Sequence, residues 1–263
     1  MKGLEPPRPV ALGARLKRFP EILTLGFRPN FQDYTQGERT LLLGANPVLY
    51  PTAFYADLFN TMGKRTFPSY HTYKFALDKI RQTALFQMQH IPHPRTRIFY
   101  GKQQKARILD HFKFPFIAKI PRGSARGCGV FRIETPGDLR TYLDRGGPAY
   151  IQEYLPLKRD MRVIVIGKEV ALAYWRHAPR GDFRTNLSQG GAIDFKDLPP
   201  RAIQLALDTA LGCGWDDVGI DIVESETGYQ VLEANVKYGT QGFQAAGIPY
   251  KEFLRDKILN GEV

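Results

Sequence analysis

Strands joined by very short turns are the feature that most limits the folds open to this chain. The apolar runs 162–166 and 169–176 are separated only by Gly167-Lys168, a two-residue loop suited to a β-hairpin. A second pair of runs, 218–224 and 229–235, turns at Glu226-Thr227-Gly228. Links this short cannot hold the crossover that parallel strands require, so each pair is predicted to be antiparallel. The sequence therefore indicates an α+β fold, with antiparallel sheets and helices to one side.

The remaining apolar runs alternate between the helical and the strand type. Apolar residues at helical spacing predict one helix from Tyr73 to Met88, which Pro92 ends, and another from Pro200, which Gly212 ends. Thr135, Pro136 and Asp138 form a capping pattern that predicts a further helix. In the first 66 residues we expect buried strands at 21–27 and 40–51 and a helix at 53–63. Three further strands are expected at 114–120, 129–133 and 149–155.

Composition narrows the class of protein. The 263 residues, 43% of them hydrophobic, suffice for one large domain or two modest ones, and no apolar run nears the roughly 20 residues of a membrane span. Two cysteines exclude a disulfide framework and a zinc ribbon, and the N-terminus lacks the apolar core of a signal peptide. We therefore expect a soluble, cytoplasmic protein.

The net charge of +11 is confined to one part of the chain. Residues 1–113 contain 18 basic and 7 acidic side chains, whereas residues 114–263 contain 19 of each. Such an asymmetric field favours an acidic partner, although the excess could also serve solubility alone.

Three oxygen-bearing side chains cluster in the second predicted hairpin. Glu233 and Asn235 are two positions apart on one strand, so both side chains leave the same face. Asp221 lies on the partner strand, within reach of that face. Hard cations such as Mg²⁺ prefer oxygen ligands, and a metal would offset the cost of placing carboxylates in apolar strands. The alternative is that the three side chains form only the polar outer face of an edge hairpin.

A glycine-rich segment follows the predicted strand that contains Lys119. Its sequence is Arg122-Gly123-Ser124-Ala125-Arg126-Gly127-Cys128-Gly129. Glycines allow a loop to approach phosphate closely, but the segment matches neither a P-loop nor a Rossmann fingerprint, so a plain flexible turn is the alternative. Lys119 favours an anion, because a lysine within an apolar strand is costly unless it meets one.

Arginines gather in a second polar segment. Arg176 and Arg180 precede Gly181-Asp182-Phe183-Arg184-Thr185-Asn186. Because guanidinium groups bind carboxylates and phosphates with two hydrogen bonds, the segment predicts an anion site, or a solvated basic loop if it acts alone.

Taken in order, these motifs resemble the ATP-grasp superfamily, and within it the RimK-type branch of ribosomal-protein glutamate ligases. The resemblance covers residues 73–247 and is carried by eight segments: Ala76-Leu77-Asp78-Lys79, Phe116-Ile117-Ala118-Lys119, Ile151-Gln152-Glu153-Tyr154, Asp160-Met161-Arg162, 181–186, Gly190-Gly191, Gly219-Ile220-Asp221-Ile222 and Leu232-Glu233-Ala234-Asn235. After Asn235 the chain departs from the family pattern, since Val236-Lys237-Tyr238-Gly239 replaces a Ser-Pro-Gly-like turn. The resemblance therefore says more about the ATP site than about the acceptor pocket.

The resemblance implies that two α+β subdomains hold ATP between them. A pre-ATP-grasp region would occupy residues 1–72, and the ATP-grasp domain residues 73–263, divided into 73–150 and 151–263. The implied ATP ligands are Lys79 and Lys119 at the phosphates, Gly123, Ser124, Arg126 and Gly127 in a closing loop, Gln152, Glu153, Tyr154 and Leu155 at adenine and ribose, and Asp160 at the ribose. The implied catalytic residues are Arg184 and Asn186 at the transferred phosphate, with Arg162 and Arg176, and the implied ligands of two Mg²⁺ or Mn²⁺ ions are Asp221, Glu233 and Asn235.

The expected activity is ATP-dependent ligation of a carboxylate to an amine through an acyl phosphate, with an amino acid such as L-glutamate as one substrate. The basic first part, including Lys64, Arg65, Arg95 and Arg97, could steer an acidic peptide or protein acceptor. Two alternatives remain. One is a nucleic-acid-binding module, which leaves the three oxygen ligands unexplained. The other is an ATP-binding regulator that has lost its chemistry.

Overall fold

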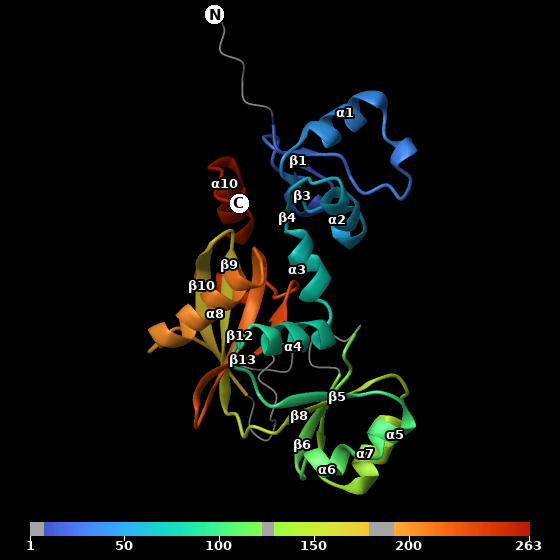
Figure 1. Ribbon diagram of the computed structural model, residues 1–263. Coiled ribbons are helices and arrows are strands. Elements are labelled where there is room, and N and C mark those ends of the chain that lie inside the picture. Colours follow the sequence, from blue (N-terminus) through green and yellow to red (C-terminus); the bar gives the residue numbers. More distant parts are fainter. Residues whose placement is uncertain (1–7, 123–128, 179–191) are drawn as a thin grey trace, which may run out of the picture.

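The computed structural model describes residues 8–122, 129–178 and 192–263 and arranges their strands in three sheets (Figure 1). A small parallel sheet from the N-terminal region lies at one end, a four-stranded antiparallel sheet lies at the other, and a five-stranded antiparallel sheet lies between them. The predicted α+β class and the two predicted hairpins are confirmed.

The five-stranded sheet contains both hairpins. Its order is β11 (Ala192–Asp194), β10 (Glu169–His177), β9 (Arg159–Ile166), β12 (Asp217–Ser225) and β13 (Gly228–Asn235). Side chains alternate between its faces. Met161, Val163 and Val165 of β9 share a core with helix α8 (Pro200–Gly212), whereas Ile164 and Ile166 share one with helices α9 (Gln241–Ala245) and α10 (Tyr250–Leu259).

The four-stranded sheet forms a separate layer with its own core. Its order is β5 (Thr96–Phe99), β8 (Ala149–Glu153), β6 (Phe116–Lys119) and β7 (Val130–Ile133), with helices α5 (Gly101–Lys105), α6 (Ile108–His111) and α7 (Pro136–Leu143) beside it. Helix α7 begins with the predicted capping box, in which Thr135 and Asp138 each accept a hydrogen bond from the other's backbone N–H. Strand β5 was not predicted.

The single helix predicted from Tyr73 to Met88 is wrong, because two helices occupy that segment. Helix α3 (Tyr70–Phe75) and helix α4 (Lys79–Met88) are separated by three residues. Asp78 accepts hydrogen bonds from the N–H groups of Ile80 and Arg81, so its side chain starts a new helix. Both helices contribute to the core around Ala76 and Phe86, so the apolar period continues across the break and conceals it.

The N-terminal region also differs from its prediction. Its strands are β2 (Leu23–Thr24), β1 (Val10–Ala11), β3 (Val48–Leu49) and β4 (Thr66–Phe67), in that order, and they pair parallel rather than antiparallel. The strand expected at 40–51 is wrong in its first half, where helix α1 (Gln36–Gly44) extends from a Thr35–Glu38 capping box. Helix α2 (Thr52–Thr61) agrees with its prediction.

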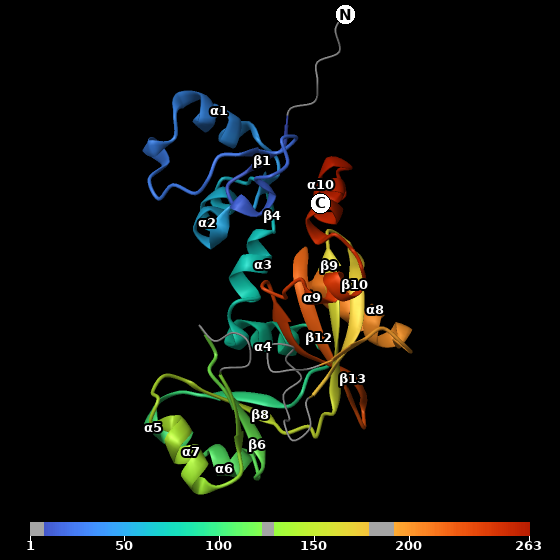
Figure 2. The ribbon, with the colours of Figure 1, turned by 180° about the vertical axis from the view of Figure 1, so that it is seen from behind.

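A buried polar cluster joins this region to the larger sheet. Asp217, at the start of β12, accepts hydrogen bonds from the hydroxyls of Tyr50 and Tyr238 and pairs with Arg15. Arg15 in turn donates to the hydroxyl of Tyr250 in α10. These contacts bind the N-terminal region directly to the sheet that carries the predicted site. Helix α10 lies beside the N-terminal region (Figure 2). No helix in the described parts of the chain is long and apolar enough to cross a membrane.

Candidate functional site

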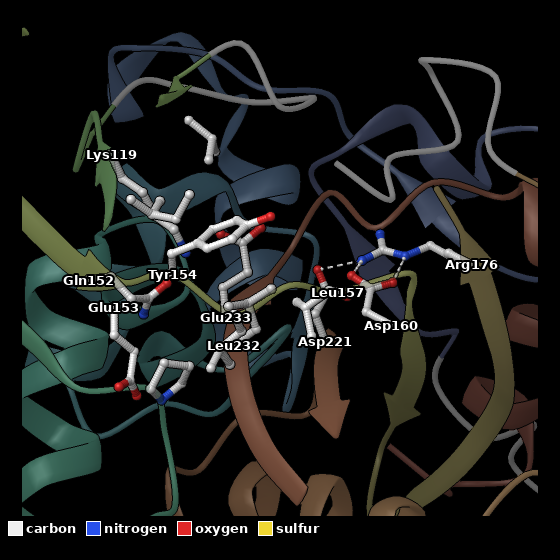
Figure 3. Close-up of a pocket in the computed structure, with 14 residues that line it drawn as sticks. Lys119, Gln152, Glu153, Tyr154, Leu157, Asp160, Arg176, Asp221, Leu232 and Glu233 are labelled. Carbon is white, nitrogen blue, oxygen red and sulfur yellow. Dashed lines mark hydrogen bonds and ion pairs between the residues drawn. The ribbon is translucent and has the colours of Figure 1, made fainter. Parts of the chain in front are cut away.

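A cavity lies where the two antiparallel sheets meet, and it collects side chains from both (Figure 3). β6, β7 and β8 contribute from the smaller sheet, and β9, β10, β12 and β13 from the larger. The lining residues that the sequence had singled out are Lys119, Gln152, Glu153, Tyr154, Leu155, Asp160, Arg176, Asp221 and Glu233.

Lys119 is the most unusual of these side chains. It is only 4% exposed, and within the described part of the chain its ammonium group has no hydrogen-bond acceptor. Burial lowers the pKa of Lys119 to about 8; nearby Lys79 lowers it as well, and Glu233 partly opposes the change. A buried cation that faces a cavity without an acceptor favours a negatively charged ligand.

The three predicted oxygen ligands lie together. The Asn235 amide nitrogen is 3.0 Å from Glu233 Oε1 and 3.4 Å from Asp221 Oδ2. Asp221 pairs directly with Glu233 across the hairpin, so their side chains share a face. A β-bulge follows at once, because Ile222 pairs with Val231 and leaves Leu232 extra. Both Leu232 and Glu233 consequently line the cavity.

Two arginines neutralise the buried aspartates beside the cavity. Arg162 donates to both oxygens of Asp221 at 2.7 Å, and Arg176 donates to both oxygens of Asp160 at 2.8 and 2.6 Å. Arg176 also lies 2.9 Å from Asp221 (Figure 3). The third nitrogen of Arg162 donates to the carbonyl of Tyr238, which connects the site to the Asp217 cluster.

These contacts bear on the roles predicted for the arginines. Arg162 does not line the cavity, and each nitrogen of its guanidinium group has an acceptor. Arg176 does line the cavity, and the paired carboxylates raise the pKa of its guanidinium group against the effect of burial. Catalytic roles for both residues stay predictions.

Helix α4 places Lys79 against Glu233. The Lys79 ammonium lies 3.3 Å from Glu233 Oε2. Burial alone would raise the pKa of Glu233, but Lys79 and Lys119 outweigh it and hold that pKa well below its usual range. Lys79 does not line the cavity itself, so its predicted phosphate contact stays a prediction.

Apolar side chains lie among the charged groups that line the cavity (Figure 3). Leu155 lies there as predicted, with Ile117, Val130, Leu157 and Leu232 as walls that the sequence analysis missed. Ile117 could have been found, because it lies two positions before Lys119 on the same strand face. Val130 enters only because it pairs with Lys119 across the sheet, and Leu232 only because of the bulge.

Two of the predicted nucleotide ligands also have structural partners. Gln152 donates from its amide to the hydroxyl of Thr96, and Glu153 accepts from the backbone N–H of Arg95. Six further predicted residues lie outside the described residues: Gly123, Ser124, Arg126, Gly127, Arg184 and Asn186.

The donor set fits a hard divalent cation. Nowhere in residues 8–122, 129–178 and 192–263 do three or more His, Cys, Asp or Glu side chains form a metal-binding group. The set formed by Asp221, Glu233 and Asn235 has two carboxylates and one amide, each with an oxygen that such a cation can bind, and the Asn235 amide nitrogen holds the set together by donating to both carboxylates. Asp221 pairs with Arg162 and Arg176, and Glu233 pairs with Lys79. The two carboxylates therefore already attract positively charged groups, as a metal site would.

Comparison with known proteins decides the family. Residues 76–258 match the RimK-like ATP-grasp domain. The chain belongs to the RimK-like ATP-grasp family. The matched segment begins just before Lys79 and includes Lys119 and the Asp221, Glu233 and Asn235 set, so the family domain contains every described residue discussed at the cavity.

Individual relatives carry ligase names. Over 176 residues the chain is 35% identical to a probable alpha-L-glutamate ligase of Citrobacter koseri and 34% identical to a ribosomal protein bS6–L-glutamate ligase of Escherichia coli. Each alignment covers 64% of this chain and 58% of the relative, so the match spans little more than half the length of those proteins.

A solved structure extends the likeness to the fold. A RimK domain ATP-grasp protein from Sphaerobacter thermophilus is similar with a TM-score of 0.69 at 16% identity, over 94% of this chain and 98% of that one. The predicted ATP-grasp fold is therefore confirmed for this member of the RimK-like family.

Proposed function

We propose that this RimK-like ATP-grasp protein is an ATP-dependent carboxylate–amine ligase. The observation that carries the proposal is Lys119, a buried ammonium group that faces the cavity without an acceptor among the described residues. The phosphates of a nucleotide would supply the missing negative charge. The apolar side chains that line the cavity, Leu155 and Leu232 among them, suit the adenine ring.

The charges of the site suit a polyanion that arrives with a cation. Lys79, Lys119, Arg162 and Arg176 are four cationic side chains beside the three carboxylates of Asp160, Asp221 and Glu233. With Glu153, which also lines the cavity, the set is balanced in charge before a ligand binds, and Lys119 is the lining cation that lacks an acceptor among the described residues and favours phosphate oxygens. Asp221, Glu233 and Asn235 would hold Mg²⁺ or Mn²⁺, which supplies charge neutralisation at the phosphates when bound.

The chemistry follows from the weakness of a carboxylate as an electrophile. A substrate carboxylate oxygen takes the γ-phosphoryl group of ATP and releases ADP, which gives an acyl phosphate. The amine then attacks the acyl carbon, inorganic phosphate leaves, and the amine loses a proton as the amide forms. Negative charge develops on the transferring oxygens, and Lys119 on β6, with Arg184 and Asn186, is proposed to stabilise it.

We propose an amino acid such as glutamate as one substrate and an acidic peptide or protein as the acceptor. Relatives that match this chain are named L-glutamate ligases, and one set is named for ribosomal protein bS6. The basic excess of residues 1–113 supports an acidic acceptor by steering it electrostatically. Arg95 and Arg97 are exposed on this part of the chain.

The test is ADP release from ATP and MgCl₂ across a panel of amino acids, with and without an acidic peptide. Hydroxylamine in a parallel reaction should trap an acyl phosphate as a hydroxamate, detectable by mass spectrometry. ADP release that depends on an amino acid, together with a hydroxamate of the same acid, is the expected result. Binding of ADP without turnover on any acid would instead support a regulator, and RNA or DNA binding that weakens steeply with salt would support the nucleic-acid alternative.

A further inference from the structure

Helix α4 touches both antiparallel sheets beside the cavity. Thr83 Oγ1 lies 2.8 Å from the hydroxyl of Tyr150, which ties the helix to β8 of the smaller sheet. On its other side, Lys79 pairs with Glu233 of β13 in the larger sheet. Gln82 lies three residues after Lys79, so both side chains emerge on the same side of the helix.

Gln82 makes two hydrogen bonds to the main chain of one residue. Its Nε2 donates to the Ala234 carbonyl at 2.9 Å, and the Ala234 N–H donates to its Oε1 at 2.9 Å. β13 is the terminal strand of the described sheet, so these two backbone groups face away from β12. The amide of Gln82 therefore replaces the neighbouring strand that Ala234 lacks.

This contact is fully buried and satisfies each of its four polar groups. Gln82 is 3% exposed and Ala234 is 1% exposed. Without the amide, the N–H and the carbonyl of Ala234 would be buried without partners, which is costly. The pairing is thus strong enough to fix the position of the strand at Ala234.

The position of Ala234 gives the contact its importance. It lies between Glu233 and Asn235, whose side chains supply two of the three oxygen donors. On the β12 side the ladder is interrupted by the bulge next to Glu233. Because a bulge locally weakens strand pairing, the orientation of these two side chains depends on what holds the opposite edge.

We propose that Gln82 is a positioning residue for the Glu233–Asn235 pair. By holding the main chain of Ala234, Gln82 keeps Glu233 at the cavity and within reach of Lys79, and keeps Asn235 against Glu233 and Asp221. The effect of this role on ligand binding rests on the proposed function, in which Glu233 and Asn235 bind the divalent cation that accompanies the nucleotide. In this proposal Gln82 itself contacts neither the cation nor the nucleotide.

The test compares Gln82→Met and Gln82→Glu with the wild type. Methionine keeps the length and lacks both polar groups, and glutamate keeps an acceptor for the Ala234 N–H but has no donor for its carbonyl. Thr209→Ala is the control, because it removes one hydrogen bond within α8, which packs in the same core as Ala234 but makes no bond to its main chain within the described residues. Calorimetry measures ADP affinity in EDTA and in MgCl₂, and NMR measures hydrogen exchange of the Ala234 amide.

In the Gln82→Met variant we expect the gain in ADP affinity from Mg²⁺ to fall by about tenfold and the Ala234 amide to exchange faster. ADP affinity in EDTA should change much less, and Gln82→Glu should give an intermediate loss. Thr209→Ala should leave both measurements at the wild-type values.

Two results would overturn the proposal. One is an unchanged Mg²⁺ effect in Gln82→Met, and the other is an equal loss of ADP affinity in EDTA and in MgCl₂, which would mean displacement of Lys79 rather than of the oxygen donors. If the wild type binds no ADP, the proposed function fails. Hydrogen exchange of the Ala234 amide then still tests whether Gln82 holds the strand, because an unchanged exchange rate in Gln82→Met would show that it does not.

Discussion

Raising the pH should weaken ADP binding through the loss of the charge on Lys119. Burial lowers the pKa of this lysine from its ordinary 10.5 to about 8, so the free protein loses the charge within an accessible range of pH. Bound phosphate oxygens would stabilise the ammonium group and raise that pKa again. ADP should therefore bind together with a proton near and above pH 8.

The size of the effect follows from the titration of one group. About half of the free protein carries the Lys119 charge at pH 8 and about one molecule in a hundred at pH 10, so ADP affinity should fall about 50-fold between these values. The ligand-free protein responds in the opposite direction. Its unfolded chain binds more protons between about pH 8 and 10.5, so its stability rises with pH there, by about 3 kcal/mol in total.

Calorimetry in two buffers of different ionisation enthalpy measures both the affinity and the proton uptake. At pH 8 about half a proton should enter per ADP bound. Lys119→Arg is the matched control, because arginine stays protonated throughout the range and should show no decline. A fall of less than about threefold from pH 8 to 10, or an equal fall in Lys119→Arg, would refute the assignment of Lys119 to the phosphates.

Three further outcomes are expected. Arg176→Met should lower the free energy of unfolding in urea by about 3 kcal/mol at pH 7, because buried Asp160 loses both hydrogen bonds from the guanidinium group while Asp221 keeps Arg162; a loss below about 1 kcal/mol would contradict this. Glu233→Gln should tighten ADP binding in EDTA by about tenfold, since it removes negative charge beside two lysines, and should abolish most of the Mg²⁺ effect in calorimetry. Arg95→Glu with Arg97→Glu should raise the KM for an acidic peptide about tenfold at low salt and little at high salt; an equal rise at both would exclude steering.

Local spacing was sufficient to predict the hairpins and the three oxygen donors. Hairpin strands pair with their nearest neighbours in sequence, so the turn places Asp221 close to Glu233. The exact pairing of Asp221 with Glu233 depends on the bulge, since the register of the turn alone would place Asp221 opposite Leu232. The capping box at Thr135 was predictable for the same reason, because the capping residue and its partner are three positions apart.

Features that depend on a single irregular residue escaped the sequence analysis. The side chain of Asp78 divides the expected helix although the apolar period continues past it. The bulge at Leu232 adds an apolar wall to the cavity, and nothing in the alternation of its strand distinguishes it from a regular neighbour.

The sequence by itself determined that Glu233 and Asn235 share a face of the final hairpin, because side chains along a strand repeat every two residues. The bulge that brings Asp221 to the same face is a feature of the structure. Only the tertiary structure decided what those residues meet. Lys79 reaches Glu233, and Gln82 reaches Ala234 across 152 positions of sequence, because α4 packs against the edge of β13. Such contacts arise from the burial of several elements against one another, and no periodicity within any one element encodes them.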